Sequence, residues 1–252
     1  MARQDDGGIC RPSWRDRLVF AYLEEPPFCG RSGAGEVTGC DIAVARHALA
    51  TAGAGPVDFV MTDFADLLPG LADGRWAMTT GLFVTPERAR QVAFSRPIWA
   101  LPDGLLVASG NPAGLTGYAA IAAAARARIG VIEGQVQHRS AVAAGIPPAR
   151  IVVYASQAEA AEAVRRGAVD AYASVAMAHR GYVAKTGGQG LEVVEIVGPA
   201  QSGAFTFAQA NDGLADAVNA ALEGFLGTPA HRALMQAHGF SGSDVDRIAP
   251  RG

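Results

Sequence analysis

The sequence has 252 residues, of which 50% are apolar, and a net charge of −3 at pH 7. A chain of this size buries either one large core or two lobes of roughly 100 to 150 residues each. Binding to nucleic acid needs several Lys or Arg residues on one face. Because the sequence holds no basic cluster and Lys185 is its only lysine, we expect no nucleic-acid partner.

The sequence also bears on the location of the protein. No apolar run approaches the ~20 residues that a membrane-spanning helix needs. The first residues, MARQDDGGICRPSWRDR, lack the apolar segment of a secretory signal. Two interpretations stay open at this point: the protein remains in the cytoplasm, or the sequence begins after a signal that has been removed.

The spacing of cysteine and histidine gives no sign of a metal site. Cys10, Cys29 and Cys40 lack the C-x-x-C pattern, and the five histidines lack zinc-type spacing, so we expect no metal or other cofactor. The polar, Gly-rich run GRSGAGEVTG lies between Cys29 and Cys40 and is able to bring them together. Spacing alone does not decide between a disulfide and free thiols.

The first part of the chain alternates between strand and helix patterns. RLVFAYL (17–23) predicts a strand, DIAVARHALATAG (41–53) a helix ended by glycine, and VDFVMTDF (57–64) a second strand. DFADLLPGLADG (63–74) predicts a short helix, and RWAMTTGLFV (75–84) a third strand. This alternation is typical of a parallel sheet covered by helices.

A helix start follows the third strand directly. Thr85 supplies an N-cap and Pro86 the first helical residue, so the helix begins at Pro86 and Arg88 lies in its first turn. Arg88 is therefore expected just past the carboxyl end of a strand.

The same alternation returns later in the chain. Strands are expected at 127–134, 151–155 and 169–174, with a helix at 156–167 that begins in a capping box of Ser156 and Glu159. The runs 191–198 and 202–207 follow, and the chain finishes in two helices, the last begun by Thr228-Pro229 and ended by Gly239. Two α/β units predict two lobes with a crevice between them, where ligands meet the carboxyl ends of strands.

Four segments together resemble one known family. GLFVTPERARQVAFSRPIW, DFADLLPGLADGR, GLLVASGNP and RRGAVDAYAS are similar to segments of the extracytoplasmic solute-binding proteins of polar amino-acid ABC importers, family 3, and the resemblance covers nearly the whole chain. Within that family the likeness is greatest to the ectoine and hydroxyectoine binding proteins, through EPPF, GLF and FLGTPAHRALMQAHGFS.

The resemblance implies a fold and a function. The fold is the type II periplasmic-binding-protein fold, an α/β architecture of two lobes joined by two crossover strands that act as a hinge near Gly104 and Gly203. Lobe one would take residues 1–104 and 205–252, and lobe two residues 107–201. The implied function is capture of a small zwitterionic solute for a membrane permease, without catalysis, by a periplasmic or otherwise extracytoplasmic monomer.

Arg88 occupies the position of the family's carboxylate-binding arginine. The helix dipole favours anions in a first turn, so a cation there needs another source of stabilisation. A bound carboxylate supplies it, because the planar guanidinium matches the two carboxylate oxygens and free backbone N–H groups add to the same site. The alternative is a surface arginine paired with Glu87 or another acid.

Phe83 departs from the general amino-acid binders, which have a small hydroxyl residue at the matching position. The resemblance to the ectoine group suggests that Phe83, Phe28 and Phe64 form a three-sided aromatic cage. Such cages hold delocalised cations by about 1 to 2 kcal/mol per ring when desolvated. The alternative is that each phenylalanine belongs to the core.

A second departure follows VDAYA, where α-amino-acid binders place an aspartate for the ligand's ammonium group. Here the chain continues with Ser174 and Val175. A buried primary ammonium without a counter-charge is costly, which disfavours a free α-amino acid. Glu25 is the candidate partner for a ring amidinium, although Glu24 beside it leaves the assignment open by one position.

Lobe two is expected to contribute the turn IEGQVQHR, whose Gln135 and Gln137 can donate to a carboxylate and accept from N–H groups. The alternative for each glutamine is an exposed polar residue on a first helical turn. The complete set of predicted ligand-binding residues is Glu25, Phe28, Phe64, Thr80, Gly81, Phe83, Arg88, Gln135, Val136, Gln137, Ser174 and Val175.

Three other functions remain as alternatives. The first is a polar amino-acid binding protein. The second is an enzyme like cyclohexadienyl dehydratase, which shares the two-lobe fold and would need a cleft acid, for which Glu133 is the lobe-two candidate. The third is the sensor domain of a larger receptor.

Overall fold

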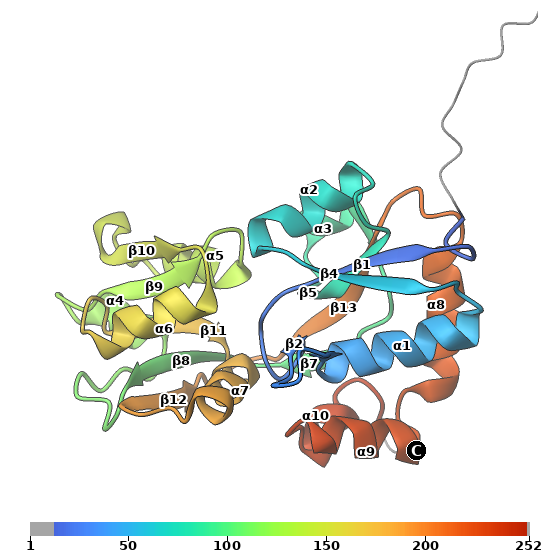
Figure 1. Cartoon of the computed structure of the whole chain (residues 1–252). Helices are drawn as coiled ribbons and strands as arrows, with labels where there is room; N and C mark the ends of the chain where they lie inside the picture. Colours follow the sequence, from blue (N-terminus) through green and yellow to red (C-terminus); the bar gives the residue numbers. More distant parts are fainter. Residues whose placement is uncertain (1–12, 251–252) are drawn as a thin grey trace, which may run out of the picture.

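The computed structural model of the chain describes residues 13–250 (Figure 1). The secondary structure is mixed α/β, and the strands form two separate large sheets and one short hairpin. We call the six-stranded sheet with its helices lobe one and the five-stranded sheet with its helices lobe two. Cys10 lies outside the described residues.

Lobe one contains both ends of the described chain. Its sheet has the order β4-β1-β5-β13-β6, with β7 paired to β13. Figure 1 shows α1 and α8 side by side on one face of this sheet and α2 on the other. The strands are β1 (Leu18–Tyr22), β4 (Val57–Met61), β5 (Met78–Phe83), β6 (Val92–Phe94), β7 (Trp99–Leu101) and β13 (Gln201–Ala208), beside the hairpin β2 (Gly30–Arg31) and β3 (Val37–Thr38). The helices are α1 (Cys40–Ala52), η1 (Phe64–Asp66), α2 (Leu67–Ala72), α3 (Pro86–Ala89), α8 (Leu214–Phe225), α9 (Pro229–Ala237) and α10 (Gly242–Asp246).

Lobe two is formed by the middle of the chain. Its sheet has the order β10-β9-β11-β8-β12. The strands are β8 (Asp103–Ala108), β9 (Ile129–Ile132), β10 (Ile151–Tyr154), β11 (Ala171–Val175) and β12 (Leu191–Glu195). The helices are α4 (Tyr118–Ala123), α5 (Val136–Ala143), η2 (Pro148–Arg150), α6 (Gln157–Arg165) and α7 (Ala176–Thr186).

Both sheets are mixed, which corrects the parallel sheet predicted from the sequence. The runs β4-β1-β5 and β10-β9-β11 are parallel, as strand–helix alternation requires. However, β13 is antiparallel to β5, β6 and β7, and β8 is antiparallel to β11 and β12. The reason is that β8 and β13 enter their sheets from the other lobe and not through a covering helix.

Two short segments, residue 102 and residues 196–200, connect the sheets. They are held together where they meet lobe two, because the Ile196 amide donates to the Asp103 carbonyl at 2.9 Å. Gly104 and Gly203 lie inside β8 and β13. A Cβ at Gly104 would come within 2.7 Å of Ala176 Cα, and one at Gly203 within 2.1 Å of the Trp99 ring. Both glycines are therefore needed for close packing. Strand β13 pairs with the lobe-one sheet from Gln201 onward. The lobe boundaries given above stay a prediction.

The predicted helix starts are mostly in place. Thr85 Oγ1 accepts from the Arg88 amide at 3.2 Å, and α3 begins at Pro86. Ser156 caps α6, but the Glu159 carboxylate accepts from the amide of Ala155 and not from that of Ser156, so the predicted capping box is half formed. The chain also ends in three helices where two were predicted, since α10 follows α9.

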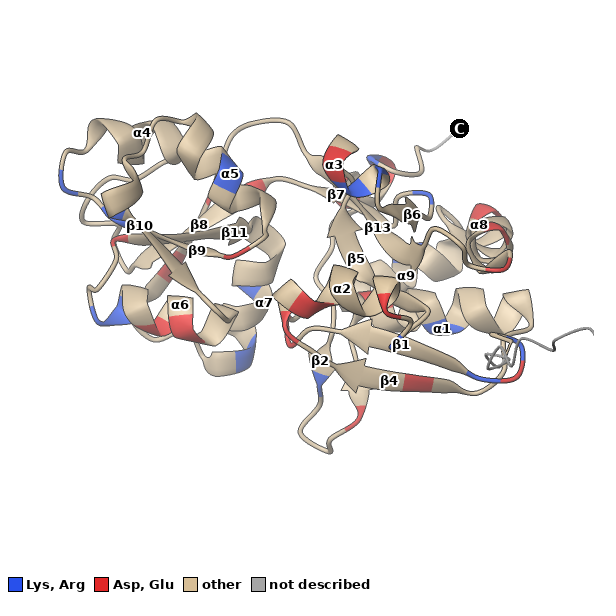
Figure 2. Ribbon diagram, turned by 90° about the horizontal axis from the view of Figure 1, so that it is seen from above, with Lys and Arg blue, Asp and Glu red and all other residues tan. Residues whose placement is uncertain are grey.

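The surface carries both signs of charge. Figure 2 shows acidic and basic residues interspersed along the helices of both lobes. Among residues 13–250, no helix is long and apolar enough to cross a membrane.

Candidate functional site

A small cavity lies between the two lobes, with a volume of ≈ 30 Å³. Every residue of the predicted ligand-binding set except Thr80 lines it, together with Leu82 and Trp99. The lining residues from lobe one are Glu25, Phe28, Phe64, Gly81, Leu82, Phe83, Arg88 and Trp99, and those from lobe two are Gln135, Val136, Gln137, Ser174 and Val175.

Most of these side chains lie where strands end. Gly81 and Phe83 belong to the last three residues of β5, and Arg88 follows in α3. In lobe two, Gln135 follows β9, and Val175 is the last residue of β11. The crevice at the carboxyl ends of strands is the usual ligand position in open α/β sheets.

Arg88 is buried and reaches across to lobe two. Its Nη1 donates to the Phe83 carbonyl at 2.9 Å, and its Nη2 donates to the Gly134 carbonyl at 3.0 Å. Its Cζ also lies 5.5 Å from the centre of the Phe64 ring. Burial lowers the pKa of the guanidinium to about 10, so the group remains charged at neutral pH.

The alternative pairing of Arg88 with Glu87 is not observed. Glu87 instead forms an ion pair with Arg139 of lobe two at 3.0 Å. Among the described residues, the Arg88 guanidinium contacts carbonyl oxygens and no carboxylate. The backbone N–H of Arg88 itself is not one of the expected free N–H groups, because Thr85 Oγ1 accepts from it. The guanidinium is thus the group available to an anion.

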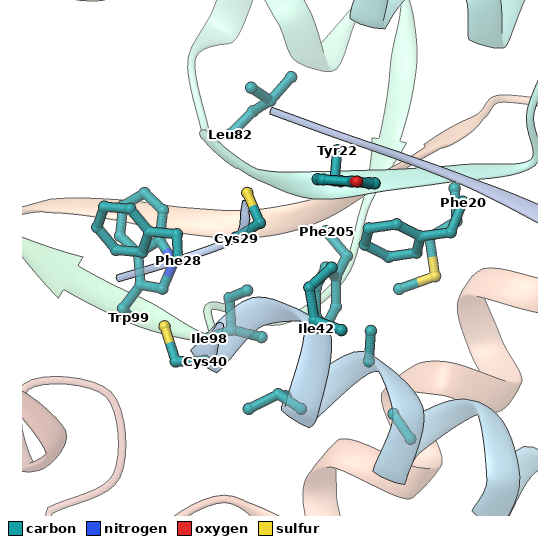
Figure 3. Close-up of a cluster of buried hydrophobic side chains, with 14 of the residues drawn as sticks. Phe20, Tyr22, Phe28, Cys29, Cys40, Ile42, Leu82, Ile98, Trp99 and Phe205 are labelled. Atoms are coloured by element: carbon teal, nitrogen blue, oxygen red, sulfur yellow. The ribbon is translucent and has the colours of Figure 1, made fainter. Parts of the chain in front are cut away.

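Trp99 organises the aromatic residues of the cavity. Its ring centre lies 5.0 Å from that of Phe28 and 5.4 Å from that of Phe83. Figure 3 shows Trp99 beside Phe28 in the buried cluster of lobe one. Trp99 is thus a fourth ring that lines the cavity with Phe28, Phe64 and Phe83, and it was not predicted from the sequence, although it ends one of the segments quoted for the family resemblance. Phe28 and Phe83 also belong to the core of lobe one, as the alternative stated, and the aromatic cage stays a prediction.

A buried carboxylate supports this wall from behind. Asp41 accepts from Trp99 Nε1 at 3.0 Å, from the Gly81 amide at 2.8 Å and from the Thr80 hydroxyl at 2.7 Å. Burial raises the pKa of Asp41, while the hydrogen bonds from Thr80, Gly81 and Trp99 lower it. Thr80 thus belongs to the support of the cavity and not to its lining. In the sequence, Asp41 is only an acid in the first turn of a helix.

Glu25 is the carboxylate that lines the cavity. Its pKa is raised to about 7 by burial and, to a smaller extent, by the nearby Asp41, while Ser174 acts in the opposite direction. Glu24 is exposed and forms an ion pair with Lys185 of lobe two. The structure therefore places Glu25 at the cavity, whereas Glu24 lines only the larger cleft beside it.

The two glutamines of lobe two differ in their partners. Gln137 Nε2 donates to Asp103 Oδ1 at 2.7 Å, and Asp103 Oδ2 accepts from the Tyr118 hydroxyl at 2.8 Å. Gln135 is the N-cap residue of α5, and its Oε1 is buried without a hydrogen-bond partner in the described part of the chain. Both side chains are buried, so the alternative of exposed polar residues does not hold.

A larger cleft of ≈ 410 Å³ adjoins the cavity and shares Glu25, Phe64 and Gln135 with it. Its other lining residues include Tyr172 and Gln157 from lobe two. Glu133, the candidate acid of the enzyme alternative, is exposed and lines neither space.

Cys29 and Cys40 are both buried and unbridged, so the free-thiol alternative describes this structure. Cys29 Sγ lies 3.3 Å from Thr80 Oγ1, and Cys40 Sγ lies 3.6 Å from Asp41 Oδ1. The two thiols occupy the cluster behind the aromatic wall (Figure 3). Within residues 13–250, no group of three or more His, Cys, Asp or Glu residues is arranged to hold a metal ion.

Comparison with known proteins identifies the family. Residues 18–238 match the bacterial extracellular solute-binding proteins, family 3. The chain belongs to this family. A probable amino-acid ABC transporter periplasmic-binding protein of Sinorhizobium fredii is 32% identical over 248 residues, which cover 93% of this chain and 80% of that protein.

Solved structures agree with this assignment. The structure of EhuB in complex with hydroxyectoine superimposes with a TM-score of 0.83 and 27% identity, covering 92% of each chain. An ancestral amino acid-binding protein described as a precursor of cyclohexadienyl dehydratase has a TM-score of 0.76 and 25% identity, over 89% of this chain and 95% of that one. An ancestral arginine-binding protein bound to arginine, at 22% identity, has a TM-score of 0.79 over 89% and 99% of the two chains and shows the shared fold.

These findings establish the fold and the general role. This solute-binding protein has the type II periplasmic-binding-protein fold. It is the solute-binding component of an amino-acid ABC importer, so it works outside the cytoplasm with a small ligand and a membrane permease.

Proposed function

We propose that this protein captures ectoine, hydroxyectoine or a closely related cyclic zwitterion in the cavity between its lobes, in the periplasm, and presents it to the permease as a monomer. The observation that carries the proposal is that one cavity is lined by a buried arginine without a carboxylate partner in the described residues, by aromatic rings and by Glu25. The similarity to EhuB, whose structure contains hydroxyectoine, supports the same ligand class.

Each part of such a ligand has a matching group. The guanidinium of Arg88 suits a carboxylate, because its planar fork forms charge-assisted hydrogen bonds to two oxygens. Phe28, Phe83 and Trp99 suit a flat cation with a delocalised charge. Glu25 suits the N–H groups of that cation. Val175 offers no counter-charge to a localised primary ammonium, which disfavours common amino acids.

Capture requires the lobes to move. A volume of ≈ 30 Å³ is room for only a few water molecules, and a ring with substituents is several times larger. The lobes are in contact across the cavity through Arg88 and Gly134 and at the rim through Glu87 and Arg139. We propose that the protein opens about residue 102 and residues 196–200 and closes on its ligand, a hinge motion in which the ligand stabilises the closed form through contacts with both lobes.

A thermal-shift screen tests the ligand class. Ectoine, hydroxyectoine, proline betaine and the common amino acids are added separately, and binding raises the apparent melting temperature by mass action. Ectoine or hydroxyectoine should give the largest shift. A larger shift with glutamine, histidine or arginine would favour the second candidate, a polar amino-acid binding protein, which the Sinorhizobium fredii relative supports. Prephenate and arogenate are included with a product assay, and turnover of either would establish the enzyme alternative.

A further inference from the structure

The amide of Gln137 is held in one orientation by a carboxylate that is not part of the cavity lining. Gln137 Nε2 donates to Asp103 Oδ1 at 2.7 Å, and the Gln137 side chain is buried. A carboxylate only accepts hydrogen bonds when ionised, so the NH₂ end of the amide must face Asp103. The carbonyl end, Oε1, is the end left for the cavity that Gln137 lines.

Asp103 is itself fixed from a second direction. Its other oxygen, Oδ2, accepts from the Tyr118 hydroxyl at 2.8 Å. Burial raises the pKa of this carboxyl, while the hydrogen bonds from Tyr118 and Gln137 act in the opposite direction and favour the ionised form. Asp103 is also the first residue of β8, directly after the segment that crosses between the lobes, and its carbonyl accepts from Ile196 of the other crossing segment. Asp103 therefore contacts the second crossing segment through its backbone carbonyl and helix α5 through its carboxylate.

The cavity then presents a defined set of acceptors from lobe two. In the described residues no hydrogen bond is donated to Gln137 Oε1, and Gln135 Oε1 is buried without a partner. A buried amide oxygen without a hydrogen-bond partner is unfavourable, and at Gln135 a donor from the ligand would remove that penalty. Both oxygens belong to residues that line the same cavity as Glu25.

We propose that Asp103 is a positioning residue that fixes Gln137 as a hydrogen-bond acceptor for an N–H or O–H group of the ligand. This inference rests on the proposed function and adds to it a criterion for the ligand. A zwitterion with N–H groups, such as ectoine, satisfies the acceptor, whereas a quaternary ammonium zwitterion, such as proline betaine, does not. Asp103 thereby contributes to specificity without touching the ligand.

An exchange of the two side-chain types tests this orientation. Gln137→Glu alone places two carboxylates at 2.7 Å from each other in the observed geometry, so ectoine binding should weaken at least ~10-fold. In the double variant Asp103→Asn with Gln137→Glu, the amide NH₂ group introduced at position 103 donates to the carboxylate introduced at position 137, whose second oxygen still accepts from the ligand. Net charge is unchanged, and the dissociation constant for ectoine should return to within ~3-fold of the wild type.

Two comparisons control the experiment. Tyr118→Phe removes the other hydrogen bond to Asp103 but leaves the contact with Gln137, so it should weaken ectoine binding less than Gln137→Glu does. Proline betaine serves as a probe without an N–H group, and any binding of it should respond much less to Gln137→Glu than ectoine binding does. Melting temperatures of all variants verify that the proteins are folded, and if Gln137→Glu does not fold, the double variant and Tyr118→Phe are compared with the wild type.

The outcomes separate the inference from the proposed function. If the wild type binds ectoine but the folded double variant does not recover binding, Gln137 acts as a donor and the inference is wrong. Equal weakening by Gln137→Glu in the wild-type background and in the Asp103→Asn background would also contradict it, because the two residues would then be independent. If the wild type binds neither probe, the proposed function fails and the inference fails with it.

Discussion

Arg88 hydrogen-bonds through its guanidinium to carbonyl oxygens and, among the described residues, to no carboxylate. Its two hydrogen bonds to Phe83 and Gly134 belong to different lobes, and the nearest acid in sequence, Glu87, is paired with Arg139. A buried charge is unfavourable unless it is paired and hydrogen-bonded. A ligand carboxylate would complete this environment, and the same side chain would then join both lobes to the ligand.

Replacing Arg88 by lysine tests that role. Arg88→Lys keeps the positive charge but loses the planar fork, so ectoine should bind at least ~10-fold more weakly. Arg90→Lys, at the exposed residue that follows the same helix, is the matched control and should leave affinity unchanged. Calorimetry measures both. Equal affinity of Arg88→Lys and the wild type would mean that the carboxylate anchor lies elsewhere.

Glu25 predicts a pH dependence of binding. Its pKa is raised to about 7, mainly by burial, from the ordinary value of 4.5. The folded protein therefore binds this proton more readily than the unfolded chain, and stability decreases as the pH rises from about 4.5 to about 7. Ligand affinity changes in the opposite sense, because a cation needs the ionised carboxylate.

Ectoine should bind about tenfold more tightly at about pH 8 than at about pH 6. The reason is that the ionised fraction of a carboxyl group with a pKa of about 7 rises about tenfold between these two pH values. Glu25→Gln should bind ectoine more weakly and lose this dependence. Calorimetric titrations across that range give the result. A wild-type affinity that is constant between the two pH values would exclude Glu25 as the partner of the cation.

At the scale of secondary-structure elements, segments with local signals were predicted correctly. Helix α1 ends at Gly53, which has φ 74, and α3 begins at the Thr85-Pro86 pair. Other elements were missed: α7 follows β11 without a side-chain cap, and α10 spans only Gly242–Asp246, although Ser241 and Asp244 form a capping box at its start. The mixed character of the sheets was also missed, because strand direction depends on which lobe a strand comes from and not on its own residues.

The candidate site likewise contains residues with a local sequence signal and residues without one. The site residues Arg88, Glu25 and the three phenylalanines were each predicted from one short sequence motif together with the family resemblance. Asp41 and Asp103 act through hydrogen bonds to residues far away in the sequence, such as Trp99 and Gln137. No periodicity or spacing reports a contact of that kind, so only the folded structure reveals these two supports.

The loop and helix that carry Cys29 and Cys40 yield a chemical prediction. Burial raises the pKa of both thiols well above its ordinary value, so thiolate is scarce and native protein should react very slowly with an alkylating agent. After denaturation without reductant, both thiols should be labelled in peptide mass spectrometry. Peptides joined by a Cys29–Cys40 disulfide in the unreduced protein would contradict the structure.

At the scale of the whole molecule, capture of a ligand in the cavity requires an open and a closed arrangement of the two lobes. The contacts of Arg88 with Gly134 and of Glu24 with Lys185 describe lobes that meet, and the ≈ 30 Å³ cavity between them is smaller than the proposed ligand. Exposed ion pairs at the rim are each worth less than about 1 kcal/mol, so they do not prevent opening. Small-angle scattering should show a smaller radius of gyration with ectoine than without it. The same radius in both conditions would contradict closure on the ligand.

The most direct test of the account is a calorimetric comparison of ectoine and hydroxyectoine with glutamine, histidine and arginine on the wild-type protein. Aromatic contacts of about 1 kcal/mol per ring and the lack of a counter-charge at Val175 act together, so the cyclic zwitterions should bind at least ~100-fold more tightly, each 1.4 kcal/mol being a factor of ten. Phe83→Thr should reduce that margin by weakening the cyclic ligands. Tight binding of a common amino acid with no response to ectoine or hydroxyectoine would contradict the proposed ligand.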